Sequence, residues 1–186
     1  MPDIKQARII ILSTDGFEQS ELEVPRDKLS AAGATVHVVS PDGETIRGWD
    51  KTDWGQDAEV DHAVSDVSPD DYDAIVLPGG QINPDILRTK PEAVEFVKKM
   101  HNAGKVVAAI CHGPWMLVEA GVVKGRKVTS FPSIKTDLVN AGGQWEDSEV
   151  VTDKGIVTSR KPDDLDAFVS KIIEEVQEGK HDRAAA

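Results

Sequence analysis

The feature that most constrains the fold is an apolar run that ends in a sharp change of sequence. Residues 105–110 (KVVAAI) contain two adjacent valines and an isoleucine over the length of one strand, which is typical of a buried strand in a parallel sheet. Cys-His-Gly-Pro follows at 111–114, and residues 115–120 then favour a helix that stops at Gly121. The proline falls in the first helical turn, where it is tolerated. The sequence therefore predicts a strand, a tight turn and a helix, with the single cysteine of the chain at the turn.

That cysteine, Cys111, is a candidate nucleophile. The partial positive charge at a helix N-terminus favours a thiolate, so we expect a lowered pKa for the Cys111 thiol. A tight turn can also bring the side chain of His112 close to the sulfur, where it would act as a base. A lone cysteine is, however, often a small buried apolar residue without chemistry. The residues alone leave both interpretations open.

Further apolar runs indicate an α/β fold. Residues 7–13 and 35–40 predict two buried strands, with a helix between them that is capped by Ser20 and Glu23 and stops at Gly33. This β-α-β unit implies a parallel sheet with a right-handed crossover. We expect a mostly parallel central sheet with helices on both faces. The other expected strands are 72–77, 127–130, 149–152 and 155–159, and the other expected helices are 83–88, 91–103, 134–141 and 163–177.

The rest of the chain adds a ribbon and a tail to a single predicted domain, residues 1–178. Residues 44–47 and 57–60 predict a small antiparallel ribbon with Trp49 and Trp54 near its exposed tip. These tryptophans would form a contact surface or cover the edge of their own domain. Residues 179–186 show no pattern that would pack against a partner, so we expect a disordered tail.

Two other loops belong at the same sheet edge as Cys111. The strand 72–77 ends in a Pro-Gly-Gly sequence, and the amides of Gly79 or Gly80 could form an oxyanion hole with an amide near His112. The turn after the first strand carries Asp15 and Glu18. A carboxyl group beside a thiolate would be protonated and could donate a hydrogen bond to the sulfur. The alternative for Glu18 is a solvated loop carboxylate.

Composition narrows the class of function. The formal net charge is −12 and aromatic residues are few, which argues against nucleic-acid binding. One cysteine cannot form an intrachain disulfide, and neither a signal peptide nor a membrane-spanning run is evident, so we expect a cytoplasmic protein. The histidines and the cysteine lack metal-ligand spacing and no nucleotide fingerprint is present, so neither a metal nor a cofactor is expected.

Short motifs spread over residues 8–176 resemble one known family. They are Phe17-Glu18-x-x-Glu21-Leu22, Leu77-Pro78-Gly79-Gly80, Ala109-Ile110-Cys111-His112-Gly113-Pro114, Gly121-Val122, Gly125-Arg126, Asn140-Ala141-Gly142-Gly143 and Thr158-Ser159-Arg160. Together they resemble the PfpI intracellular protease family of the Parkinsonism-associated deglycase superfamily. The resemblance implies a class I glutamine amidotransferase-like domain, which is a flavodoxin-like three-layer α/β sandwich.

The resemblance also implies roles for individual residues. Cys111 would be the nucleophile, His112 the second catalytic residue and Glu18 the buried acid that bonds the sulfur. In the protease members an acid from a neighbouring subunit orients the histidine, and the matching position here is Asp85, which is shorter than the family's Glu. This arrangement implies a homo-oligomer, a dimer or larger.

Activities of the resembling family suggest the function. We expect a stress-related cysteine hydrolase acting on methylglyoxal- or glyoxal-modified proteins or on small carbonyl compounds. An intracellular cysteine peptidase acting on peptides is the first alternative. The second is a non-enzymatic redox sensor or chaperone, because an accessible thiolate oxidises readily and an adjacent acid could stabilise the sulfinate.

Overall fold

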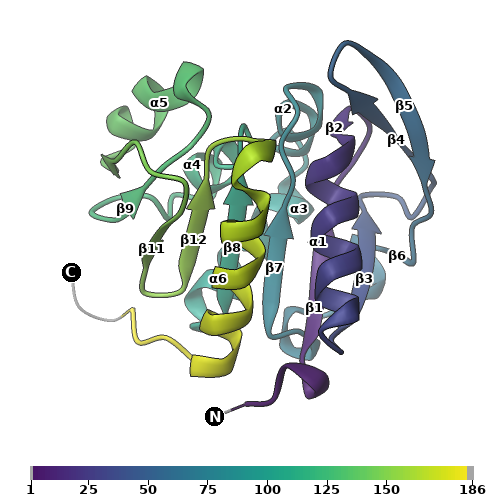
Figure 1. Cartoon of the computed structure of the whole chain (residues 1–186), viewed down its shortest axis with the longest axis horizontal. Coiled ribbons are helices and arrows are strands. Elements are labelled where there is room, and N and C mark those ends of the chain that lie inside the picture. Colours follow the sequence, from purple (N-terminus) through teal and green to yellow (C-terminus); the bar gives the residue numbers. More distant parts are fainter. Residues whose placement is uncertain (1, 184–186) are drawn as a thin grey trace.

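The computed structural model of the chain describes residues 2–183 and has one seven-stranded sheet between two layers of helices (Figure 1). The strand order is β11-β12-β8-β7-β1-β3-β6. Every neighbouring pair in this sheet is parallel except β11 with β12, which confirms the predicted α/β class. The strands are β1 (Arg8–Leu12), β3 (Thr35–Ser40), β6 (His62–Ala63), β7 (Ala74–Leu77), β8 (Val106–Ile110), β11 (Val151–Asp153) and β12 (Ile156–Ser159).

Helices cover both faces of the sheet, and shorter elements connect them. The α-helices are α1 (Gln19–Ala31), α2 (Ile82–Leu87), α3 (Pro91–Asn102), α4 (Trp115–Glu119), α5 (Lys135–Asn140) and α6 (Leu165–Glu178). The 3₁₀ turns are Ile4–Gln6, Val64–Asp66, Pro69–Asp71, Pro132–Ile134 and Pro162–Asp164. Two small sheets lie outside the central one, formed by β9 (Lys127–Val128) with β10 (Gln144–Trp145) and by β2 (Phe17–Glu18), β4 (Ile46–Asp50) and β5 (Asp53–Ala58). No helix in residues 2–183 has the length and apolar character needed to span a membrane.

The central strands are apolar without alternation because both of their faces are buried. In β1, Ile9 and Ile11 belong to one core cluster while Ile10 and Leu12 belong to the other, and all four are fully buried. Helices α1 and α6 cover the first cluster, to which they contribute Leu22, Leu29, Phe168 and Ile172. Helix α3 covers the second cluster, to which it contributes Phe96, Val97 and Met100. Helix packing on both faces thus fixes the sheet, and the carboxyl ends of β1, β7 and β8 meet at one edge.

Helix α1 begins one residue before the predicted cap. Glu18 occupies the N-cap position and no side chain caps the helix, so the predicted Ser20–Glu23 capping box is wrong. The reason is the short strand β2, which pairs with β4 through Phe17 and Glu18 and holds the chain extended up to the first helical residue. The start of the helix is therefore set by sheet pairing, and this decides which acidic residue faces inward.

The predicted antiparallel ribbon is present as β4 and β5. Its turn contains Lys51 in the left-handed region, with φ of 59°. Trp49 and Trp54 pair across the two strands with their rings edge to face, 5.5 Å between centroids. Trp54 is exposed, whereas Trp49 is half-buried. The ribbon stands at the carboxyl edge of the sheet, beside the start of α1 (Figure 1).

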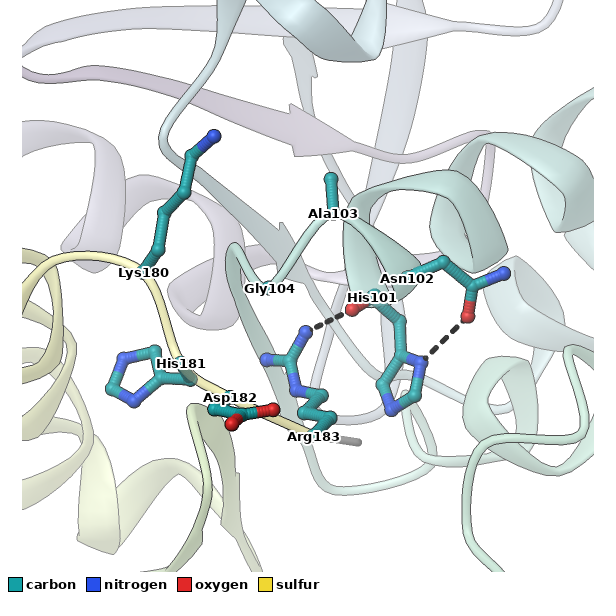
Figure 2. A pocket seen from close by; sticks show the side chains of 8 residues that line it. All are labelled: His101, Asn102, Ala103, Gly104, Lys180, His181, Asp182 and Arg183. Carbon is teal, nitrogen blue, oxygen red and sulfur yellow. Dashed lines mark hydrogen bonds between the residues drawn. The ribbon is translucent and has the colours of Figure 1, made fainter. Parts of the chain in front are cut away.

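The tail packs against the domain as far as it is described. The backbone amide of His181 donates to the carbonyl of Gly104 at 2.8 Å. The Arg183 guanidinium donates to the carbonyls of Lys154, Lys105 and His101. Figure 2 shows Arg183 reaching across to the end of α3, with Lys180 pointing away. Residues 179–183 thus contact backbone carbonyls of the domain, and such contacts leave no pattern in sequence. Disorder of the tail in solution stays a prediction, and residues 184–186 lie outside the described residues.

Arg183→Ala should lower the free energy of unfolding by about 1–3 kcal/mol, because several backbone carbonyl groups lose the charged donor that binds them. Lys180→Ala is the matched control, because Lys180 is exposed on the same segment. Urea unfolding of both variants and the wild type measures the difference. Equal stability of Arg183→Ala and wild type would show that the tail does not dock in solution.

Candidate active site

Cys111 lies in a strained turn directly after β8. Its φ is 62°, a left-handed conformation that costs a non-glycine residue on the order of 1–3 kcal/mol. Two backbone hydrogen bonds hold it there: the Cys111 amide donates to the carbonyl of Ser159 at 3.0 Å, and its carbonyl accepts from the amide of Phe131 at 2.8 Å. Strain of this kind is common at functional sites. The arrangement matches the predicted strand–turn–helix geometry of a nucleophile elbow.

The turn also requires a glycine at position 113, two residues after Cys111. A Cβ atom on Gly113 would lie 2.4 Å from the carbonyl oxygen of Leu77 and 2.9 Å from that of Ile110. Backbone atoms cannot move aside as a flexible side chain can. Gly113 therefore allows the turn to pass close to β7, and its amide closes the turn by donating to Ile110 at 2.8 Å.

A cavity of about 550 Å³ opens beside the Cys111 sulfur. Cys111 itself is 7% exposed, so it is reached only through this cavity. The side chains around it come from β2, α1, the ribbon, the start of α2, the turn after β8 and the loop after β9. They include Glu18, Glu21, Trp49, Lys51, Ile82, His112 and Phe131. The cavity is of a size for small organic groups.

The buried acid beside the sulfur is Glu21. Its side chain is fully buried, accepts a hydrogen bond from the Gly79 amide at 2.7 Å and hydrogen-bonds the Cys111 side chain. Burial raises the pKa of Glu21 to about 8, so the carboxyl group is protonated at neutral pH. Its other oxygen has no hydrogen-bond partner among the described residues. A protonated carboxyl group in this position can donate to the sulfur.

The structure corrects the prediction that Glu18 fills this position. Glu18 is half-buried at the cavity wall and accepts a hydrogen bond from the Lys51 amide; burial raises its pKa as well. As N-cap residue it lies before the first helical turn, whereas Glu21 lies within that turn and faces the core. The signal for Glu21 was present in the motif Phe-Glu-x-x-Glu, but the sequence did not show where the helix begins. Asp15, the other carboxylate considered in this turn, is exposed and accepts from the Arg47 amide.

Two backbone amides converge on the sulfur. The amides of Gly80 and His112 both hydrogen-bond the Cys111 side chain. These are two of the three residues predicted to form the oxyanion hole, and that role stays a prediction. The Gly79 amide instead donates to Glu21. Gly79 still matters, because a Cβ there would lie 2.5 Å from the Glu21 carboxylate and 2.6 Å from the Cys111 Cβ.

The pKa of the Cys111 thiol moves in the opposite direction from the one expected. Burial raises it first, and a Glu21 carboxylate raises it further, while the Gly80 and His112 amides lower it. The expected contribution of a helix dipole is small because α4 has five residues and begins at Trp115, four positions after the sulfur. Both shifts favour the uncharged forms, a Cys111 thiol beside a protonated Glu21. A thiolate at this site would form by transfer of the thiol proton.

His112 is placed to accept that proton. Its Nδ1 lies 3.2 Å from the Cys111 sulfur, and burial lowers the pKa of the imidazole, which favours the neutral form. The ring stacks on Phe131 with 4.8 Å between centroids and meets the edge of Trp115 at 5.2 Å. Its Nε2 lies 3.2 Å from the hydroxyl of Ser133. Ser133 was missed in the sequence, because only the folded loop after β9 brings it to the elbow.

Asp85 lies on the exposed side of α2. Among the described residues, His112 has Cys111 and Ser133 as its hydrogen-bonding partners. The contribution of Asp85 from a neighbouring subunit stays a prediction. A separate group, Glu175, Glu178 and His181, brings possible metal-ligand atoms within 4.8 Å of one another, but it lies at the C-terminal end of α6, away from the sulfur.

Comparison with known proteins identifies the family and the fold. The model of the DJ-1/PfpI family matches residues 7–175. The chain belongs to the DJ-1/PfpI family. This confirms the resemblance found in the motifs, and the flavodoxin-like sandwich that it implied is the fold observed.

Relatives in the family include named deglycases. Deglycase PYRAB04690 of Pyrococcus abyssi is 46% identical over 166 residues, 89% of this chain and 97% of the relative. Protein/nucleic acid deglycase 2 of Escherichia coli is 42% identical over 163 residues, 87% of this chain and 92% of the relative. Among solved structures, Drosophila melanogaster DJ-1beta has a TM-score of 0.83 at 30% identity, covering 93% of this chain and 95% of its own.

The pKa of Glu21 predicts an unusual pH dependence of stability. Because the folded-state pKa, about 8, exceeds the unfolded value of 4.5, the proton stabilises the folded state. This stabilisation is complete below pH 4.5 and is lost as the pH rises through 8. The slope is about 1.4 kcal/mol per pH unit, so the wild type should lose about 3 kcal/mol between pH 5 and pH 8 from this group.

Urea unfolding at pH 5 and pH 8 tests this expectation. Glu21→Gln should abolish most of the loss, because the amide keeps the shape and the hydrogen bonds but cannot ionise. Glu18→Gln is the comparison variant: because Glu18 is only half-buried, although its pKa is also raised, this variant should remove a smaller part of the loss than Glu21→Gln. Identical pH profiles for the wild type and Glu21→Gln would contradict the placement of the buried acid.

Proposed function

We propose that the protein is a cysteine hydrolase that removes methylglyoxal- or glyoxal-derived adducts from proteins or acts on small carbonyl compounds. The observation that carries the proposal is the convergence on one sulfur of the Glu21 carboxyl group, the His112 imidazole and two backbone amides, inside a cavity. Relatives with 46% and 42% identity bear the name deglycase. Removal of such an adduct requires a nucleophile that attacks an electrophilic carbon, and the Cys111 sulfur is the candidate nucleophile.

The reaction begins with formation of the nucleophile. The Cys111 proton moves to Nδ1 of His112, 3.2 Å away, which leaves a thiolate and an imidazolium. The sulfur then bonds to the carbinol carbon that carries the modified nitrogen, the C–N bond breaks, and His112 gives its proton to the departing amine, which leaves a hemithioacetal on sulfur. The C–H proton of that carbon moves to the neighbouring carbonyl carbon and the hydroxyl proton to the carbonyl oxygen, which converts the hemithioacetal into a thioester. Water adds to the thioester, the Gly80 and His112 amides, which hydrogen-bond the sulfur, are near enough to stabilise the resulting oxyanion, and the fragment leaves as a 2-hydroxy acid while the thiol is restored.

Access to the sulfur favours small groups as substrates. Cys111 is 7% exposed at the base of a cavity, so a modified side chain can reach it more readily than the main chain of a folded protein. Trp49, Ile82 and Phe131 supply apolar walls there. The peptidase and redox-sensor alternatives, the homo-oligomer, the cytoplasmic location and the association with stress stay predictions.

The test uses a methylglyoxal-treated peptide that contains lysine and arginine, with loss of the adduct followed by mass spectrometry. Cys111→Ala should abolish the enzymatic rate, and His112→Ala should lower it by about 10²- to 10⁴-fold because the proton acceptor is lost. Adduct release at equal rates by the wild type and Cys111→Ala would refute the proposal.

The same assay separates the alternatives. Cys111-dependent cleavage of the unmodified peptide, without release of the adduct, would identify a peptidase. Protection against oxidative stress in cells that survives His112→Ala but not Cys111→Ala, together with no turnover of either peptide, would identify a redox sensor. Thermal melting of each variant verifies that it is folded.

A further inference from the structure

The hydrogen-bond partner of His112 on the side away from the sulfur is Ser133 of the same chain. Ser133 lies in the 3₁₀ turn Pro132–Ile134, between β9 and α5, and its Oγ is 3.2 Å from His112 Nε2. The turn is tied to the elbow because the Phe131 amide donates to the Cys111 carbonyl at 2.8 Å. The position of Ser133 is therefore set by the same backbone contact that holds the nucleophile.

We propose that Ser133 is the positioning residue of the site and that it fixes the tautomer of His112. In this arrangement Nε2 carries the proton and donates it to the Ser133 oxygen, which leaves the lone pair of Nδ1 facing the Cys111 thiol. The Ser133 hydroxyl proton remains free to bond water, because the residue is exposed. This inference rests on the proposed function only in assigning His112 the role of proton acceptor.

The proton transfer then has a defined course. The thiol proton leaves sulfur and binds Nδ1, so the products are a thiolate and an imidazolium. Nε2–H donates to Ser133 before and after the transfer, and this bond strengthens when the ring becomes charged. Ser133 thus stabilises the ion pair relative to the neutral pair without touching a substrate.

The surroundings of His112 explain why a hydroxyl group has this effect. One face of the ring is covered by Phe131 and one edge by Trp115, neither of which can accept a proton. The Trp115 indole donates to Asp137 and carries the Arg88 guanidinium over its ring. Beyond the sulfur lies Glu21, and Glu18 and Lys51 line the cavity. Among residues 2–183, Ser133 is the group that hydrogen-bonds Nε2.

The inference also bears on the predicted role of Asp85. Nε2 holds one proton and directs it to one acceptor. With Ser133 in that place, a single chain contains a complete Cys–His–Ser arrangement, and an acid from a neighbouring subunit is not required to orient the ring.

The test is the rate of Cys111 alkylation by iodoacetamide as a function of pH, followed by intact mass. The single cysteine makes the readout unambiguous. Ser133→Ala should move the midpoint of the rate profile upward by about 0.5–1 pH unit, which is the gain in one hydrogen bond when its donor becomes charged, and should lower kcat for adduct release with little change in KM. Ser133→Thr retains the hydroxyl group and should restore the wild-type midpoint.

The matched control is Thr136→Ala, an exposed residue on the adjoining helix α5 that should leave the midpoint unchanged. The inference is overturned if Ser133→Ala titrates like the wild type, whatever Asp85→Ala does in the same experiment. Because alkylation requires no substrate, its outcome is independent of the proposed function. Persistence of adduct release in Cys111→Ala would refute that function and leave the test of Ser133 intact.

Discussion

The interaction on which the site depends is the burial of one carboxyl group between three elements of the fold. Glu21 comes from α1, receives a hydrogen bond from the Gly79 amide after β7, and contacts the Cys111 sulfur after β8. The contact is possible because Gly79 has no side chain to separate the two groups. A buried carboxyl group is tolerated when it is protonated, and protonation is also the state in which it can donate to sulfur. The same interaction therefore joins the layers of the fold and prepares the nucleophile.

The main part of the fold follows from the sequence because burial on both faces leaves a direct pattern. The apolar runs around Ile10, Ile75 and Ala108 predict buried central strands, and the structure places all three residues in such strands. The elbow could be predicted for the same reason. The cysteine interrupts an apolar strand and precedes a glycine and a proline, so its place at the carboxyl edge was fixed before any side chain was located.

The details of the site were harder to predict because they depend on pairing between segments far apart in the chain. Whether Glu18 or Glu21 lies beside the sulfur depends on where α1 begins, and this is set by the two-residue strand β2, which pairs with the ribbon. The same step separates the two glycines. The Gly79 amide donates to Glu21 and is therefore not available to a substrate, whereas the Gly80 amide is not engaged by Glu21. Ser133 is 21 residues from His112 and reaches it through one backbone bond from Phe131. None of these contacts produces a periodic pattern or a biased composition in the sequence from which it could be predicted.

The ribbon of β4 and β5 has a consequence of a different kind. It pairs with the two residues of β2 and buries Ile46 and Ala58 in the core, and Trp49 and Lys51 on it form a wall of the cavity. The groups that act on the sulfur, by contrast, come from α1 and from the turns after β7, β8 and β9. One part of the cavity wall therefore lies on a hairpin that carries none of the groups contacting the sulfur. A hairpin of different length or sequence would change the shape of the cavity entrance while Glu21, His112 and the backbone amides stay in place.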